Sequence, residues 1–259
     1  MRLLGVDLAA ADDNTAMAVL DYRNSVWTLS EICHPCADED IVKAVSRLPS
    51  NALAGFDCPL GWPREFGKFL ADHRGEANRA IPVKVDLLRR LTDVRVPEVV
   101  ERNTPTSIRL HPLSVSSDRI AVPALRMAGL ERQLLGPLAP DRSGERVIVE
   151  VYPAAALALW NLPHRGYKGA KGQLIRDEIL RGLSERAGAR LDIANFQQKL
   201  STNDHCLDAL LCALVTVATV TGRRVSDSVP RDQDERHLAV EEGWIQLPAT
   251  DLAAVLGAV

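Results

Sequence analysis

The chain has 259 residues, 46% of them hydrophobic, which is enough for one large α/β domain or two small ones with a substantial buried core. Its formal net charge of -3 and pI near 6.1 exclude the strongly basic global field that marks many nucleic-acid-binding proteins. No apolar run approaches the roughly 18 residues of a membrane-spanning helix.

The first residues, MRLLGVDLAAAD, become acidic too early for a secretory signal, so we expect a cytoplasmic protein without membrane association. The five cysteines are irregularly spaced, which favours free thiols over a disulfide framework. Cys33-His34-Pro35-Cys36 has the spacing of half a zinc or redox motif. No second CxxC or HxxxH completes four tetrahedral ligands, so zinc is not expected there.

Three strand-like segments open the chain at 2–8, 15–22 and 25–32, with Arg23-Asn24 as a tight turn between the last two. They predict an antiparallel meander. Residues 39–48 carry apolar side chains at helical spacing and predict a crossover helix. A parallel strand at 51–57 should follow, ended by the prolines and glycine of CPLGWP.

Residues 64–140 form an irregular helical region, with several prolines, short helical stretches and one long helix expected at 118–135. We interpret this stretch as an insertion over the sheet. Because the sequence contains no repeat and no clear linker, we expect a single domain over residues 1–259.

A β-branched strand is predicted at 146–152, followed by the helix-forming AAALALW. After a stretch rich in Lys and Arg, residues 203–221 predict a strongly apolar helix that stops at Gly222. The tail at 241–248 is expected to be a strand or a cover segment.

Three expected strands carry an acid near their carboxyl end: Asp7 in GVDLA, Asp57 in GFDCP and Glu150 in VEVYP. A carboxylate among apolar neighbours is costly to bury unless it is hydrogen-bonded, paired or bound to metal. Ligands of open α/β sheets gather outside the carboxyl ends of the strands. Acids there can therefore converge on one cation, and we expect Asp7, Asp57 and Glu150 to be catalytic.

The apolar helix adds Asp204, His205 and Asp208, whose spacing of three and four residues places them on one side. Asp208 lies in CLDALLCALV, a run that otherwise favours complete burial. Oxygen ligands with one imidazole favour Mg²⁺ or Mn²⁺. Two such ions about 4 Å apart would support phosphodiester hydrolysis, although the sequence leaves the number of ions open.

Simpler roles remain open for several of these residues. Either Asn203 or Asp204 is the N-cap of the apolar helix, and an Asp204 that caps cannot ligate. Glu150 is alternatively a helix cap or a partner of Arg146. His205 is alternatively a solvated first-turn residue.

Several motifs resemble the family called domain of unknown function 429: GVDLAAADDNTAMAVLD, AGFDCPLGWP, RRLTD, VEVYPAAALALW, GYKG and DHCLDALLCALVTVAT. The resemblance spans nearly the whole chain. It implies a nuclease of the ribonuclease H-like fold. That fold is α/β, with a mixed five-stranded sheet of order 3-2-1-4-5, strand 2 antiparallel, flanked by helices.

A wider resemblance runs to the RuvC-type Holliday-junction resolvases, in which acids on the first strand, the fourth strand and a helix form the metal site. Asp7, Asp57 and Asp208 fall on those positions. His205 stands where the resolvases usually have an Asp, and this leaves less charge for a second hard cation.

The resemblance also singles out Arg90 and Asp93 of RRLTD, and Tyr167 and Lys168 of GYKG, as substrate-binding residues. The cations would contact phosphates and Tyr167 would stack on a base. The alternative is a surface salt bridge and a packed loop. Seven Lys or Arg against three acids over 163–190 leave a surplus of 7 - 3 = +4, which could flank a nucleic-acid backbone.

The resulting hypothesis is a nuclease that depends on Mg²⁺ or Mn²⁺ and cleaves DNA or RNA, with a homodimer left open. One alternative is a catalytically silent nucleic-acid- or protein-binding module of the same fold. Another is a nucleotide or small-phosphoester hydrolase in which 58–140 forms a lid. The actin, Hsp70 and sugar-kinase branch of the fold ranks low, because no second Gly-rich phosphate loop is present.

Overall fold

The fold is seen in a computed structural model that describes residues 1–73, 83–136 and 139–258. It is an α/β structure built on one mixed sheet of seven strands in the order β6-β3-β2-β1-β4-β5-β7. The strands are β1 Arg2–Asp7, β2 Ala16–Arg23, β3 Val26–Cys33, β4 Ala54–Phe56, β5 Ile148–Val151, β6 Leu191–Asp192 and β7 Ile245–Gln246. Antiparallel pairing joins β1 to β2 and β2 to β3, and all other neighbours are parallel.

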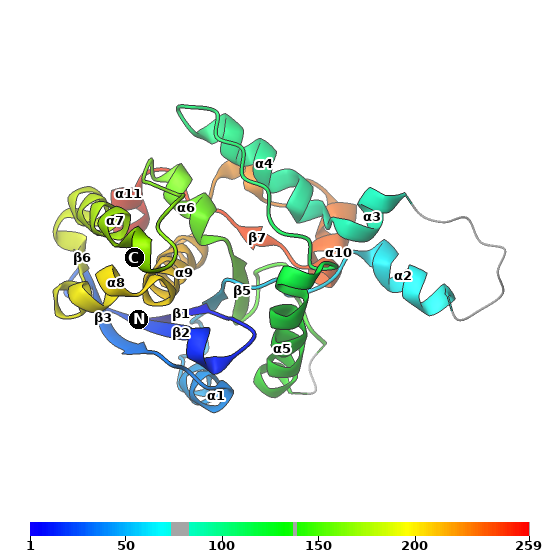
Figure 1. The fold of residues 1–259 in the computed structure, drawn as a ribbon, viewed down its shortest axis with the longest axis horizontal. Coiled ribbons are helices and arrows are strands. Elements are labelled where there is room, and N and C mark those ends of the chain that lie inside the picture. The colour runs from blue at the N-terminus through cyan, green and yellow to red at the C-terminus, as the bar shows by residue number, and fades with distance from the viewer. Residues whose placement is uncertain (74–82, 137–138, 259) are drawn as a thin grey trace.

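Helices connect these strands and cover both faces of the sheet (Figure 1). They are α1 Asp38–Ser46, α2 Arg64–Asp72, α3 Lys84–Leu88, α4 Leu91–Asn103, α5 Asp118–Leu135, α6 Pro153–Leu159, α7 Gln173–Ala187, α8 Gln197–Thr202, α9 Asp204–Val220, α10 Gln233–Glu242 and α11 Leu252–Leu256. Short 3₁₀ turns occur at Asp12–Asn14, Ala170–Gly172, Gly188–Arg190, Ala194–Phe196 and Ser226–Ser228.

The apolar core has a layer on each side of the sheet. On one side α6, α7, α8, α9 and α11 pack on the sheet, and α1 and α5 pack on the other side (Figure 1). Strand alternation divides β1 between the layers, since Leu3 joins the first and Leu4 and Val6 join the second. A third cluster joins α4, α6 and β7 beyond the end of β5.

Helix α9 lies at the centre of its layer because two strand glycines let it approach the sheet. A Cβ atom at Gly5 of β1 would overlap the backbone of Ala213, and one at Gly55 of β4 would overlap the hydroxyl of Thr216. The helix is buried almost all round, as its apolar sequence predicts. This close approach brings its N-terminal turns over the ends of β1 and β4.

The predicted strand count was wrong, since the sheet has seven strands and not five. The order also differs, because β6 extends the β3 edge and β7 the β5 edge. Both added strands are only two residues long, too short to leave a periodic pattern in the sequence.

One smaller prediction is also corrected. The turn between β2 and β3 is formed by Asn24 and Ser25, both with positive φ, one residue later than predicted. The described part of the region predicted as an irregular helical insertion, 64–140, contains the helices α2 to α5, while its residues 74–82 and 137–138 lie outside the described residues. The long helix predicted at 118–135 is confirmed as α5. Among the described helices, none combines the length and apolar character needed to cross a membrane.

Candidate metal centre

Two acids stand side by side at the carboxyl ends of neighbouring strands. Asp7 is the last residue of β1, and Asp57 directly follows β4. The strands are parallel, with Gly5 opposite Gly55. Because alternate residues of a strand share a face, both acids point to the α9 side, as the two glycines do.

A third acid, Asp208, enters from α9, where it directly precedes Ala209, one of the two residues that lie against Gly5. One carboxylate oxygen of each of Asp7, Asp57 and Asp208 lies within 4.8 Å of the other two. We call these three residues the acid cluster. Within the described part of the chain, no other carboxylate, imidazole or thiol joins them at this distance.

The three members of the acid cluster differ in burial and in compensation: Asp7 and Asp208 are buried and have partners, whereas Asp57 is partly exposed. The residue Asp208 is fully buried and Asp7 is 8% exposed. The Asp57 carboxylate accepts no hydrogen bond from any residue that the structure describes. Burial, and then the charge of Asp7, raise the pKa of Asp57 well above its usual value. Burial also raises the pKa of Asp208 to about 6, although the charge of Lys168 works against this.

The GYKG loop contacts the acid cluster through two side chains. The Tyr167 hydroxyl donates a hydrogen bond to Oδ1 of Asp208 at 2.9 Å, and the Lys168 ammonium pairs with Oδ2. Burial acts to lower the pKa of Lys168, but the charges of Asp208, Asp7 and Asp57 outweigh it and raise that pKa. Tyr167 is 2% exposed, which leaves no ring face for a base. The burial of Tyr167 thus does not favour the predicted stacking on a base, and its hydroxyl contacts Asp208 instead, whereas the Lys168 side chain is half-exposed.

Asp204 and His205 are not among the clustered ligands. His205 Nδ1 instead lies 2.7 Å from Oδ2 of Asp7, and this hydrogen bond raises the pKa of His205. The side chain of Asn203 accepts a hydrogen bond from Cys206 N, so Asn203 is the N-cap of α9. Asp204 is therefore not the N-cap, but it still lies outside the acid cluster. The predicted metal roles of Asp204 and His205 thus lack support from the geometry, and His205 orients Asp7.

Glu150 belongs to a second group of charges at the end of β5. Both Arg90 terminal nitrogens donate to its carboxylate at 2.7 Å, and Arg90 Nη2 also donates to Asp93 at 2.8 Å. Leu60 N donates to Glu150, and Leu91 N donates to Glu242. We call Arg90, Asp93 and Glu150 the ion network. The side chains of its three members are at most 3% exposed.

The ion network contains three residues for which the sequence predicted other roles. Arg90 and Asp93, predicted to bind substrate, and Glu150, predicted to be catalytic, use their polar atoms on one another inside the protein. Arg146, the alternative partner considered for Glu150, instead faces Asp141. The available signal was local: Asp93 stands three residues after Arg90 at a helix start and accepts from Arg90 N, which is a capping arrangement.

Sequence reasoning missed two residues near the acid cluster. His34 stacks on His205 with ring centroids 6.0 Å apart, and its Nε2 lies 3.3 Å from Asn203 Nδ2. Arg176 was counted in the basic surplus, but it is 1% exposed and donates to the carbonyls of Tyr167 and Gly169. It therefore anchors the GYKG loop. Only the CHPC motif pointed to His34, and no sequence signal separated Arg176 from its basic neighbours.

A cavity of about 170 Å³ lies between the acid cluster and the ion network. Asp57 lines one part of its wall, and Arg90 and Glu150 line another. The remaining lining residues are mainly apolar or aromatic: Cys58, Pro59, Pro112, Leu113, Ile120, Val151, Tyr152 and Ile245. A ligand held there would reach Asp57 directly.

Comparison with known proteins gives one match. The model of a family described as "Protein of unknown function (DUF429)" matches residues 5–235. No curated protein and no solved structure matches the chain significantly. The matched range includes all members of the acid cluster.

Proposed function

The chain belongs to the DUF429 family, a family of unknown function, and we propose that it is a divalent-metal-dependent nuclease that hydrolyses phosphodiester bonds of DNA or RNA. The observation that carries this proposal is the convergence of Asp7, Asp57 and Asp208 from three separate elements. We further propose that the fold is ribonuclease H-like. In support, the inner strands run β3-β2-β1-β4-β5 with β2 antiparallel.

The donor set fits Mg²⁺ or Mn²⁺. Its ligands are carboxylate oxygens, which hard cations prefer, and they leave positions for water and for substrate phosphate. The Asp57 carboxylate accepts no hydrogen bond from a described residue and lies beside Asp7. This supports the fit, because a cation between the two carboxylates would offset the repulsion that raises the pKa of Asp57. Neither the sulfur nor the imidazole ligands typical of zinc lie within this set.

The residues around the acid cluster have separable roles in this proposal. Asp7, Asp57 and Asp208 hold the cation, while His205 and Tyr167 fix the carboxylates of Asp7 and Asp208. The Lys168 ammonium contacts a phosphate oxygen when substrate enters. The bound cation supplies charge neutralisation at the phosphate and a lowered pKa for the attacking water.

The cavity beside Asp57 favours a second candidate, a hydrolase of nucleotides or other small phosphoesters. At about 170 Å³ it has room for one small ring, and Pro112, Leu113 and Ile120 of its wall come from the 64–140 region. Tyr152 supplies an aromatic side chain to the same wall. A small substrate would place its ring there and its phosphate at Asp57.

The test combines calorimetry with Mg²⁺ and Mn²⁺ and cleavage assays. The substrates are single-stranded, duplex and branched DNA and RNA, mononucleotides, and bis(p-nitrophenyl) phosphate. The variants are Asp7→Asn, Asp57→Asn and Asp208→Asn, with exposed Asp234→Asn as the matched control. We expect metal binding and cleavage by wild type and the control, and loss of both in the three variants.

The other outcomes discriminate among the alternatives. Absence of both metal heat and cleavage in wild type contradicts the proposal. Cleavage that survives all three substitutions moves the active site elsewhere. Cleavage confined to mononucleotides and small esters supports the second candidate, and nucleic-acid binding without any cleavage supports a silent module.

A further inference from the structure

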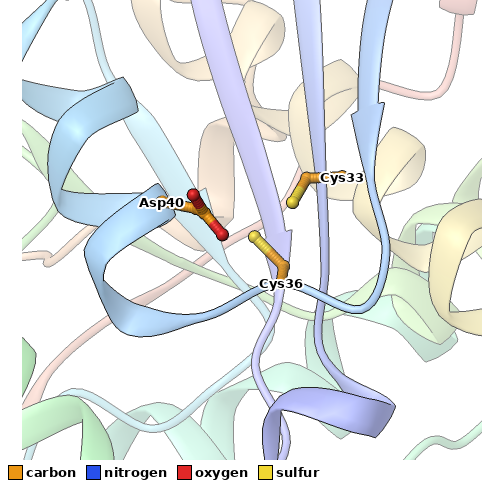
Figure 2. Close-up of side chains that lie close together, drawn as sticks. All are labelled: Cys33, Cys36 and Asp40. Atoms are coloured by element: carbon orange, nitrogen blue, oxygen red, sulfur yellow. The ribbon is translucent and has the colours of Figure 1, made fainter.

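Two cysteines and an aspartate meet on the opposite side of the β1–β3 meander from α9. Cys33 ends β3, Cys36 lies in the following turn, and Asp40 is in the first turn of α1. Cys33 Sγ, Cys36 Sγ and one Asp40 carboxylate oxygen all lie within 4.8 Å of one another. Figure 2 shows the two sulfurs and the carboxylate turned toward a common space between strand and helix.

His34, which lies between the two cysteines in the sequence, takes no part in this arrangement. His34 stacks on His205 and so points toward the acid cluster, away from the sulfurs. Asp40 takes its place as third ligand because α1 begins two residues after Cys36. One Asp40 oxygen accepts a long helix-start hydrogen bond of 3.4 Å from Ala37 N, and the other accepts none from the residues that the structure describes.

We propose that Cys33, Cys36 and Asp40 bind one zinc-class divalent cation, at a site separate from the acid cluster. Two thiolates and one carboxylate suit a borderline cation, whereas Mg²⁺ disfavours sulfur. Tetrahedral ligands about 2.3 Å from zinc stand roughly 3.8 Å apart, so the ligand atoms need to close by about 1 Å at most. Each thiol releases its proton to solvent as its sulfur–metal bond forms.

A cavity of about 130 Å³ leads to the site and gives a fourth position to water or a small ligand. Cys33 and Asp40 line it together with Glu31, Lys43 and Arg47. Cys33 is partly exposed and Asp40 exposed, so a cation can enter, while buried Cys36 anchors it. The bound cation would tie β3 to α1.

A redox dithiol is the competing role for this pair. Reactive thiols lie in electropositive surroundings that stabilise the thiolate. Lys43 and Arg47 line the adjoining cavity, but the Asp40 carboxylate lies within 4.8 Å of both sulfurs, where it disfavours a thiolate and supplies a ligand to a cation. The three-residue cluster is therefore better suited to metal than to disulfide exchange.

Cobalt(II), which replaces zinc in thiolate sites and absorbs light, provides the test. The reduced, metal-free full chain is titrated with Co²⁺, and we expect a sulfur-to-cobalt charge-transfer band that saturates at one equivalent and is removed by Zn²⁺. Cys33→Ser and Cys36→Ser should abolish the band, and Asp40→Asn should weaken Co²⁺ binding by ~10-fold or more. The buried-cysteine control Cys212→Ala, and Asp57→Asn in the acid cluster, should keep it.

Melting curves of the metal-free variants establish that they fold, and Zn²⁺ should raise the melting temperature of wild type but not of folded Cys33→Ser. Three results overturn the proposal: no charge-transfer band in wild type, a band that survives in folded Cys33→Ser and Cys36→Ser, or a Cys33–Cys36 disulfide that forms in air with Zn²⁺ present at the metal-free rate.

Discussion

The acid cluster and the ion network face the same physical problem and differ in its solution. Both gather carboxylates at the ends of parallel strands, where an unpaired charge is costly to bury. In the ion network the chain supplies its own cation, since Arg90 donates to both Glu150 and Asp93. In the acid cluster Asp57 has no hydrogen-bond donor among the described residues. The difference agrees with a structural role for the ion network and with the cation that we propose for the acid cluster.

The pKa shifts follow the same division. Burial raises the pKa of Glu150, but the charge and hydrogen bonds of Arg90 act to lower it. Burial raises the pKa of Asp57 well above its ordinary value, and Asp7 adds to that increase. The Lys168 charge opposes it from a half-exposed side chain. An added divalent cation would supply the missing compensation.

Arg90→Met should give the largest effect. It removes the guanidinium and leaves Glu150 and Asp93 buried without their partner, which should lower the free energy of unfolding by about 3–5 kcal/mol. Urea unfolding followed by circular dichroism measures this loss. Arg109→Met, which breaks the exposed pair with Glu101, is the matched control and should cost less than about 1 kcal/mol. Similar small losses of stability in both variants would contradict a structural role for the ion network.

Asp57→Asn should have opposite effects on stability and on metal binding. The folded pKa of Asp57 lies above its unfolded value, so its ionisation opposes folding at neutral pH. The neutral amide removes that cost, and we expect the metal-free protein to gain about 1 kcal/mol. Mn²⁺ affinity should fall by ~100-fold or more. Urea unfolding in EDTA measures the change in stability, and calorimetry measures Mn²⁺ binding. A destabilised variant that still binds Mn²⁺ normally would contradict both expectations.

The acid cluster was predictable because its signals are local. Asp7, Asp57 and Asp208 each interrupt an apolar run, and the order of strands and helix brings them to one edge. The β1–β3 meander, the crossover helix and α9 follow from hydrophobic period for the same reason.

The ion network was not predictable because its partners are distant in sequence. Arg90 and Glu150 are 60 positions apart, and in the sequence Glu150 looks like Asp57, an acid at a strand end. Only the tertiary structure shows that the Arg90 guanidinium compensates the charge of Glu150, as a bound cation would. Nor did the sequence indicate Asp40 as the third proposed ligand beside Cys33 and Cys36. An acid in the first turn of a helix is common, because it interacts favourably with the helix dipole.

Mn²⁺ binding to the acid cluster should weaken at low pH. A carboxylate must be ionised to ligate, and burial raises the pKa of Asp208 to about 6. Affinity should therefore be constant well above that pKa and fall at least about tenfold per pH unit below it. Paramagnetic resonance of free Mn²⁺ between about pH 5 and about pH 8 measures this dependence. Constant affinity down to about pH 5 would show that the ligand set differs from the one proposed.

Lys168→Met should give the smallest effect and the closest comparison with Arg90. Lys168 partly plays the part of a cation in the metal-free acid cluster, but its side chain is 53% exposed, so its loss should cost less than about 1 kcal/mol in EDTA. Saturating Mn²⁺ should cancel this loss, because the divalent cation then compensates Asp208 in place of the ammonium. Urea unfolding of wild type and variant, with and without Mn²⁺, measures the difference. No such recovery is expected for Arg90→Met, because the carboxylates of Glu150 and Asp93 are almost fully buried. A loss of stability in Lys168→Met that persisted in Mn²⁺ would show that Lys168 is a structural partner like Arg90.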